Sequence, residues 1–221
     1  KMNQKDHSLL EKMNIQSDAI VGNQCERNDI EDFLYNGHRI KYLSFAEKGV
    51  GLNRNNALMR ATADICVIAD DDIIFNDNYV DAIKRSFEEN PAADVIIFNL
   101  YRPKKNNKTT KKKYRVRYHN FMKFGATRIA IRRKSITMKG INFNLHFGGG
   151  AEYSAGEDTL FILDCLKNKL KVIAVPEHIA QLTDFRKSTW FNGYTEKYFI
   201  DKGVLFASIS ARFSLLLCLQ F

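Results

Sequence analysis

The stretch DICVIADDDIIF, residues 64–75, decides the fold. Its apolar half, DICVIA, predicts a short buried strand, and Asp70, Asp71 and Asp72 follow that strand directly. Carboxylates this close repel one another and lose hydration at the end of a buried strand, so they predict a bound cation. Because residues two apart in an extended segment point the same way, Asp70 and Asp72 can address one ion.

Oxygen ligands of this kind suit Mg²⁺ or Mn²⁺, whose coordination is commonly completed by substrate phosphates. A nucleotide diphosphate is therefore the ligand expected beside the ion. The acids also fit a second interpretation, a turn and N-cap cluster formed with Asn76, Asp77 and Asn78. The residues alone leave both interpretations open.

Strand-like runs flank this stretch at residues 18–22, 39–45 and 94–100. An amphipathic run at 78–90 repeats apolar side chains every four residues, as a helix that covers a sheet does. Strands alternating with helices predict an α/β fold with a mostly parallel central sheet, which binds ligands beyond the carboxyl ends of its strands. Further helices are expected at 6–14, 51–61 and 157–169, and further strands at 125–133 and 170–177.

The composition agrees with a single folded domain. The chain has 221 residues, of which 45% are hydrophobic and 12% aromatic, and these values exclude disorder and coiled coil. The four cysteines form no CxxC pair and have no histidine at zinc spacing, so no disulfide framework or zinc site is expected. The amino terminus lacks the apolar core of a secretory signal, which predicts a cytoplasmic protein.

Charge divides the chain into two halves. Residues 1–100 carry 11 basic and 17 acidic side chains, whereas residues 101–221 carry 23 and 8. The basic stretch 102–117 either is a solvated loop or contacts an anionic surface. The segment 203–221 approaches the length of a membrane span, but Arg212 interrupts it, so we expect an interfacial or packing helix.

A glycine-rich run, FGGGAEYSAGEDTLF at 147–161, leads into a predicted helix whose first turn holds Glu157 and Asp158. The positive end of a helix keeps a carboxylate ionised, as a general base requires. An ordinary acidic first turn is the other interpretation of this run.

A third motif, EKGVGLNRNNAL at 47–58, opens a helix with glycines and carries Arg54 in its first turns. A glycine-rich turn before a helix suits a pyrophosphate. The spacing matches neither the dinucleotide fingerprint nor the P-loop.

In this order, the three motifs resemble the family 2 glycosyltransferases of the GT-A fold, over residues 6–200. That family has a strand with polar residues at its end, a G-x-S-x-x-R-N-x-A/G-L helix, an Asp-rich metal motif and a G-E-D helix. Here these appear as IVGNQ, G-V-G-L-N-R-N-N-A-L, IADDD and AGEDTLF. The resemblance implies a Rossmann-like central sheet flanked by helices.

The resemblance also implies roles for single residues. Asp72 and Asp70 become the metal ligands, with Asp70 and Asp71 near the ribose, and Arg54 helps to hold the nucleotide. Asp158 becomes the catalytic base, and Glu157 orients the acceptor.

Asn23 occupies the position where many members of the family place an Asp against uracil, so the base preference is open. The family also begins with an apolar strand ending in Pro-Thr-Tyr-Asn or a similar sequence. The chain begins at KMNQKDHSLL, and we expect the sheet to lack this first strand.

The implied reaction moves a sugar, with inversion, from a nucleotide-diphosphate sugar to a hydroxyl of a glycan or lipid-linked acceptor. UDP-sugars are favoured, and a role in polysaccharide or glycolipid assembly is expected. Residues 1–202 would form the GT-A domain, with a nucleotide half at 1–100 and an acceptor half at 101–202. Aromatic and basic residues of the second half suggest peripheral contact with the inner face of the cell membrane.

Two other functions compete with this one. A nucleotidyltransferase uses a similar sheet, metal and nucleotide, but the glycine and Arg-Lys-rich loop usual after its first strand is not visible here. A basic module could bind nucleic acid through residues 102–117, but Asp70–Asp72 and Glu157–Asp158 would then repel the ligand. Glycosyl transfer explains both acid groups, and no nucleic-acid partner is favoured.

Overall fold

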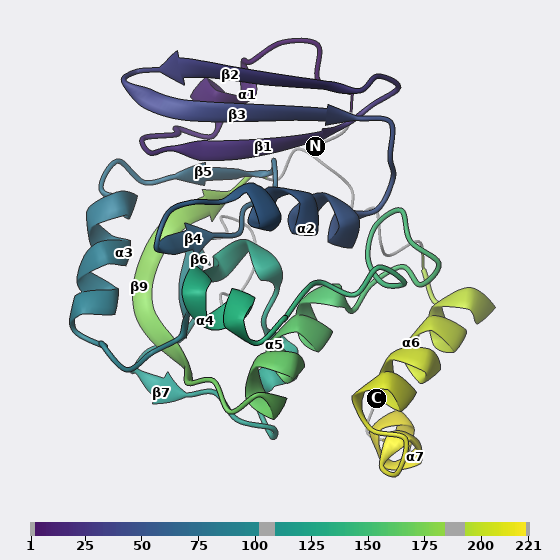
Figure 1. Cartoon of the computed structure of the whole chain (residues 1–221). Helices are drawn as coiled ribbons and strands as arrows, with labels where there is room; N and C mark the ends of the chain where they lie inside the picture. The colour runs from purple at the N-terminus through teal and green to yellow at the C-terminus, as the bar shows by residue number, and fades with distance from the viewer. Residues whose placement is uncertain (1–2, 102–108, 184–192, 220–221) are drawn as a thin grey trace.

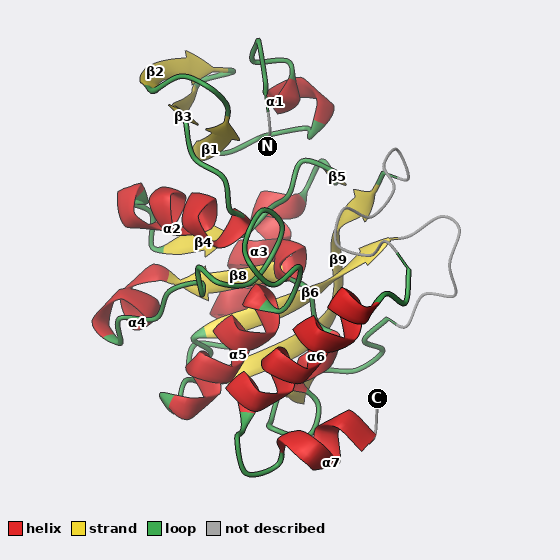
Figure 2. Ribbon diagram, turned by 90° about the vertical axis from the view of Figure 1, so that its right-hand side faces the viewer, coloured by secondary structure: helices red, strands yellow, loops and turns green. Residues whose placement is uncertain are grey.

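Two β-sheets form the frame of the protein (Figure 1). The computed structural model describes residues 3–101, 109–183 and 193–219. Helices flank the larger sheet, and Figure 2 shows α5 and α6 lying in front of its strands. The arrangement confirms the α/β fold with helices around a central sheet.

The smaller sheet has the order β1-β3-β2. β1 (Ala19–Gln24) runs parallel to β3 (His38–Phe45), and β2 (Asp29–Tyr35) runs antiparallel to β3. The β2–β3 turn, Asn36–Gly37, has φ values of 49° and 81°, as a type I′ hairpin requires. β2 is absent from the expected elements, although an Asn-Gly pair is the usual signal for such a hairpin.

The larger sheet has the order β4-β8-β6-β9-β5, and β7 also pairs with β9. Its strands are β4 (Ile65–Val67), β5 (Ile73–Phe75), β6 (Val95–Tyr101), β7 (Tyr114–Arg115), β8 (Ile129–Arg132) and β9 (Val172–Leu182). Strands were expected at four of these positions, at 64–69, 94–100, 125–133 and 170–177. All four are confirmed, with 3₁₀ turns at Phe121–Lys123 and Ala126–Arg128 before β8.

The expectation of mostly parallel strands is wrong in detail. Among the described residues the strands form seven pairings, of which only β1–β3 and β6–β9 are parallel. β8 lies between β4 and β6 and runs antiparallel to both, so these two parallel strands are not direct neighbours. Helical crossovers predict the direction of two strands, but they cannot show that a later strand inserts between them.

The core lies on both faces of the larger sheet because the side chains of β6 alternate. Val95 and Ile97 face a cluster that includes Phe161 and Leu163 of α5 (Glu157–Lys167). Ile96 and Phe98 face a second cluster that includes Ile83 and Phe87 of α3 (Tyr79–Glu88). The other helices of this part are α1 (Leu9–Lys12), α2 (Val50–Arg60) and α4 (Arg133–Met138). α1 is much shorter than the helix expected at 6–14.

A cavity of about 1550 Å³ opens between the two sheets. Residues of β1 and β4 both line it, and among the described residues no strand pairs with the outer edge of β1 or of β4. The two sheets are therefore not joined by a strand. α2 packs against β1, and residues from its first turn to its end also line the cavity.

The carboxyl-terminal segment forms two helices. α6 (Glu196–Ile209) begins seven residues before the expected start at 203, and α7 (Ser214–Leu219) follows a break at Ser210. Within the part that the structure describes, no helix is both long and apolar enough to cross a membrane. Residues 102–108 of the basic stretch and Trp190 lie outside the described residues.

Candidate active site

The cavity between the sheets brings together the acids that follow β4 and the acids that begin α5. Asp70, Asp71 and Asp72 line it, and so do Glu157 and Asp158. The two groups are separated by 84 residues in sequence, but the turn after β4 and the amino end of α5 meet at this wall. The sequence expectation that both groups serve one site agrees with this geometry.

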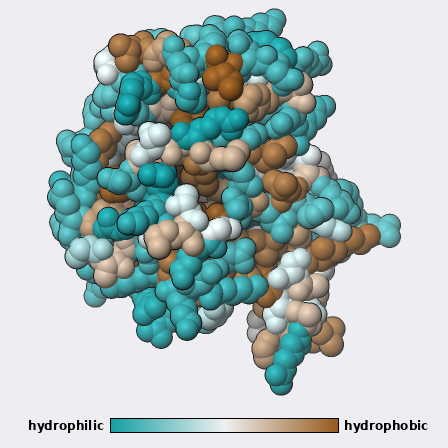
Figure 3. All heavy atoms as spheres, in the orientation of Figure 1, coloured by the Kyte–Doolittle hydropathy of each residue, from teal (hydrophilic) through white to brown (hydrophobic). Residues whose placement is uncertain are grey.

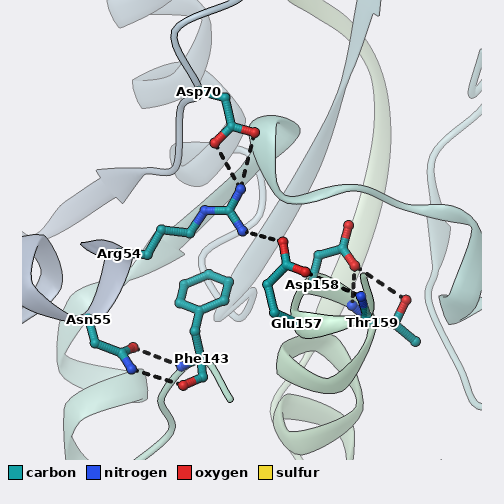
Figure 4. Close-up of polar contacts among 8 residues, drawn as sticks. Arg54, Asn55, Asp70, Phe143, Glu157, Asp158 and Thr159 are labelled. Atoms are coloured by element: carbon teal, nitrogen blue, oxygen red, sulfur yellow. Dashed lines mark hydrogen bonds and ion pairs between the residues drawn. The ribbon is translucent and has the colours of Figure 1, made fainter. Parts of the chain in front are cut away.

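Arg54 connects the two groups of acids (Figure 4). Its Nη2 donates to Oδ1 and Oδ2 of Asp70 at 2.8 and 3.1 Å, and its Nη1 donates to Oε1 of Glu157 at 2.8 Å. The Arg54 side chain is only 9% exposed. Burial opposes its charge, but the two carboxylates outweigh that effect and raise the Arg54 pKa.

An aromatic platform holds the guanidinium in place. Arg54 lies over the ring of Phe143, 5.2 Å from its centroid, and Phe143 stacks on Phe161 of α5 at 4.3 Å. Asn55 fixes the backbone of Phe143 by donating to its carbonyl at 2.9 Å and accepting from its N–H at 2.8 Å. The Arg54 side chain is thus oriented by α2, by the segment that holds Phe143 and, through Phe161, by α5.

The glycine-rich loop before α5 is shaped by close packing. Gly156 has φ of 126°, and a Cβ at this residue would lie 2.6 Å from Leu205 of α6. Gly148 has φ of 102°, and a Cβ there would lie 2.8 Å from the carboxylate of Glu157. Both positions therefore require glycine, and they place the first turn of α5 against the cavity.

Asp158 is the half-buried acid at the start of α5. Its Oδ1 accepts from the N–H of Thr159 at 2.7 Å. Its Oδ2 lies near Gly125, where an added Cβ would be 3.5 Å away, in ordinary van der Waals contact. Burial, reinforced by the charge of Glu157, raises the pKa of Asp158 to about 6. A carboxylate with this pKa can accept a proton near neutral pH.

Glu157 occupies a different environment from Asp158. It is buried, binds Arg54, and accepts from the N–H of Gly156 through Oε2 at 3.2 Å. With both oxygens used inside the protein, Glu157 is placed to hold Arg54. Glu157 also lines the cavity, and its expected role in orienting the acceptor stays a prediction.

The turn that carries the three acids is fixed at its far end. The carbonyl of Asp72 accepts from the N–H and Oγ1 of Thr183, which follows β9, at 2.7 and 2.9 Å. The Asp70 side chain is 38% exposed beside the cavity. The position of the turn is thus set by the larger sheet.

These acids fit a cation that is shared with a ligand. The described residues hold no group of three His, Cys, Asp or Glu side chains able to enclose a metal. Asp72 and Asp70 offer only oxygen atoms, the donor type that Mg²⁺ and Mn²⁺ take, and such ions often bind one or two carboxylates plus substrate phosphates. The donor atoms therefore match the predicted ion in type, and its binding at Asp72 and Asp70 stays a prediction.

Asn23 is not brought to the site. It is 1% exposed, its Oδ1 accepts from the N–H of Gln4 at 2.9 Å, and its Nδ2 donates to the Gln4 carbonyl and to Ser44 Oγ. Its neighbours Gly22 and Gln24 line the cavity instead. The hydrogen bonds give Asn23 a structural role at the end of β1.

The amino end of α2 is also occupied by the protein. The N–H of Gly49 donates to Gln24 Oε1 at 2.7 Å, and the N–H of Val50 donates to the carbonyl of Gly149 at 2.9 Å. These two amides are not available to a phosphate. Arg54 is the part of the 47–58 motif that reaches the acids.

Three residues of the site are absent from the sequence expectations. Gly125 adjoins Asp158, Phe143 supports Arg54, and Lys202 of α6 lines the cavity and faces Asp158. Burial lowers the pKa of Lys202, while Asp158 and Asp201 oppose that shift. No local motif marks these residues, because each reaches the site only through the packing of distant elements.

Comparison with known proteins adds two findings. A family model described as glycosyl transferase family 2 matches residues 17–149. A structure of S. aureus TarS 1–349 in complex with UDP-GlcNAc is similar at 17% identity, with a TM-score of 0.62, over 78% of this chain and 51% of that chain. A structure of the same S. aureus protein with UDP gives 16% identity and a TM-score of 0.59, over 78% of this chain and 49% of that one.

The chain thus spans about half the length of these structures, and at such identities the similarity shows the fold alone. Among curated proteins, none matches the sequence. The residues matched by the family model include the end of β1, Arg54 and the acids after β4. Glu157 and Asp158 lie just beyond the matched residues.

Proposed function

This chain belongs to glycosyl transferase family 2, and we propose that it moves a sugar from a nucleotide-diphosphate sugar to an acceptor hydroxyl. The observation that carries the proposal is the shared cavity. The acids after β4 line it together with Asp158, whose pKa is raised to about 6. Family membership favours glycosyl transfer over nucleotidyl transfer and over a nucleic-acid module.

A UDP-sugar is the favoured donor. The similar S. aureus structures are complexes with UDP-GlcNAc and UDP, which supports a uridine nucleotide without fixing the sugar. The turn at Asp70–Asp72 would receive the nucleotide and its phosphates.

Asp158 would act as the general base. Its carboxylate takes the proton from the acceptor hydroxyl while that oxygen forms a bond to the anomeric carbon. The bond from this carbon to the diphosphate oxygen breaks on the opposite face, so the configuration inverts and the nucleoside diphosphate leaves with the electron pair. Lys202 and Arg54 line the same cavity, and the charge of each interacts with that of Asp158.

Asp72 and Asp70 are the residues that would hold Mg²⁺ or Mn²⁺. When bound, such an ion stabilises the negative charge that develops on the departing diphosphate. Asp70 also keeps its ion pair with Arg54, which fixes the direction of its carboxylate.

The rate of transfer should depend on the protonation of Asp158. Because burial raises its pKa to about 6, the active carboxylate form is lost as the pH falls through that value. We expect kcat to rise about tenfold per pH unit below pH 6 and to level off above it. The measurement is the pH dependence of nucleoside diphosphate release at saturating donor; a flat profile between pH 5 and 8 would exclude Asp158 as the titrating base.

The acceptor is proposed to be a lipid-linked or surface glycan reached from a membrane. The C-terminal apolar face, on and beside α6 and α7, consists of exposed side chains (Figure 3). Its members are Tyr194, Phe199, Ile200, Phe213, Leu215, Leu216 and Leu219. Together with the basic second half of the chain, this face suits an anionic lipid surface.

Flotation with liposomes tests the membrane contact. We expect the chain to float with phosphatidylglycerol vesicles at moderate salt, and the triple variant Phe213→Ser, Leu215→Ser, Leu219→Ser to float about tenfold less. The matched control is the triple variant Leu34→Ser, Met59→Ser, Met138→Ser, which removes three similarly exposed apolar side chains elsewhere. Equal flotation of both variants, or none by the unaltered chain, rejects the contact.

A screen of UDP-, GDP- and TDP-sugars with Mn²⁺ tests the function itself. The expected result is release of the nucleoside diphosphate from one donor class. Absence of release from all three, with the fold verified by circular dichroism, counts against glycosyl transfer.

A further inference from the structure

We infer that Arg54 is a positioning residue that joins the donor-side and acceptor-side carboxylates into one unit around Asp158. This inference rests on the proposed function and deepens it. It assigns Arg54 an action through Asp70 and Glu157, in addition to the nucleotide contact implied by the family resemblance.

The geometry of the guanidinium carries the inference. One nitrogen of Arg54 binds both oxygens of Asp70, and the other binds Glu157, with all three bonds between 2.8 and 3.1 Å. A planar fork with fixed donor directions can hold two carboxylates at a set angle, whereas a lysine ammonium acts as a point charge. The donor side and the first turn of α5 are therefore tied through one side chain.

Burial makes the connection between Arg54 and Glu157 costly to break. Arg54 is 9% exposed and the Glu157 side chain is 11% exposed, so water does little to screen this ion pair. Removing one partner leaves the other charge buried without compensation. The platform of Phe143 and Asn55 restricts Arg54 to this orientation.

Charged side chains of both signs surround Asp158. Glu157 on α5 and Asp70 after β4 raise the pKa of Asp158 beyond the effect of burial, and Arg54 on α2 lowers it. Lys202 on α6 also faces Asp158. Because Arg54 is the cation that compensates both neighbouring acids, its loss leaves Asp158 beside two unbalanced carboxylates.

The test measures the titration midpoint of the Asp158 carboxyl carbon by NMR, without substrate or metal. Arg54→Gln should move the midpoint upward by at least about half a pH unit from its position near 6. Glu157→Gln removes the neighbouring negative charge and should move it downward. Arg85→Gln, which removes an arginine of the surface pair with Glu177, should leave it unchanged.

A second measurement separates positioning from charge. In Arg54→Lys the charge remains but the fork is lost, so kcat on the donor identified by the screen should fall at least tenfold, while the Asp158 midpoint moves less than in Arg54→Gln. An unmoved midpoint in Arg54→Gln overturns the inference, whatever Glu157→Gln does. A rise in donor KM alone, with kcat and midpoint unchanged in Arg54→Lys, also overturns it.

The two proposals fail in different ways. If no donor is turned over by the unaltered chain, the proposed function fails, but the titration still decides the role of Arg54. If Arg54→Gln does not fold, kcat and the Asp158 midpoint in Arg54→Lys remain the deciding results.

Discussion

Replacing Asp158 with asparagine is expected to lower the rate of sugar transfer by about 10²- to 10⁴-fold, the usual contribution of a general base. Asparagine has nearly the same shape and can still accept from the N–H of Thr159, so the first turn of α5 should persist. What is lost is the ability to take a proton from the acceptor. The measurement is kcat with donor and acceptor both saturating.

The same variant should not be less stable than the unaltered chain at neutral pH. In the folded protein the pKa of Asp158 is raised from 3.8 to about 6, so folding favours the protonated form. The corresponding stability is present below about pH 4 and is lost as the pH rises through 6. At pH 7.5 the ionised carboxylate of Asp158 destabilises the folded state, and asparagine carries no such charge. We therefore expect the free energy of unfolding of Asp158→Asn at pH 7.5 to be higher than that of the unaltered chain by about 1–3 kcal/mol.

A matched control lies on the same helix. Asp164 of α5 is half-buried, and its replacement by asparagine should change kcat less than about twofold. Near-normal turnover in Asp158→Asn would remove Asp158 from the role of base. A parallel loss of activity and of stability in that variant would indicate damage to the fold instead.

Replacing Asp72 with alanine is the second change with a large expected effect. We expect transfer to fall by at least about 100-fold, because the variant loses the proposed principal ligand of the ion that stabilises the departing diphosphate. The carbonyl of Asp72, which accepts from Thr183, is unchanged by this substitution, so the turn after β4 should keep its position.

Asp81→Ala provides the control, since Asp81 is an exposed acid in the first turn of α3. It should retain full activity and full Mn²⁺ binding as followed by electron paramagnetic resonance. Asp72→Ala should bind Mn²⁺ more weakly in the presence of UDP. Unaltered turnover of the unsubstituted chain in EDTA would contradict the proposed metal requirement.

The motifs predicted most of the site because their chemistry is local. A buried strand followed by Asp70–Asp72, and a glycine-rich loop followed by Glu157 and Asp158, are recognisable from residue type and order. Their meeting in one cavity follows from the fold that this order indicates. The family model and the similarity to the S. aureus structures bear out that fold.

The sequence could not show how neighbouring polar residues divide their work. Glu157 and Asp158 are adjacent and both line the cavity, but of the two only Glu157 forms an ion pair with Arg54. Asn23 follows a strand as a ligand-binding residue does, yet its amide is used by Gln4 and Ser44. Such differences depend on side-chain direction, which no pattern along the chain records.

Strand pairing was the other feature beyond reach. β8 is recognisable as a strand, but its insertion between β4 and β6 depends on contacts between residues far apart in sequence. The Asn36–Gly37 turn, by contrast, carried a usable local signal for β2.

The central claim is that a metal–diphosphate donor bound at the turn after β4 lies within reach of Asp158. Paramagnetic broadening of backbone amide signals by Mn²⁺ with UDP measures this directly. The account predicts that the amides of residues 70–72, Gly125 and 157–159 broaden together at low Mn²⁺ concentration, and that the broadening weakens along α5 from residues 157–159 to Asp164. Broadening at 70–72 without any at 157–159, or broadening unaffected by Asp72→Ala, would contradict it.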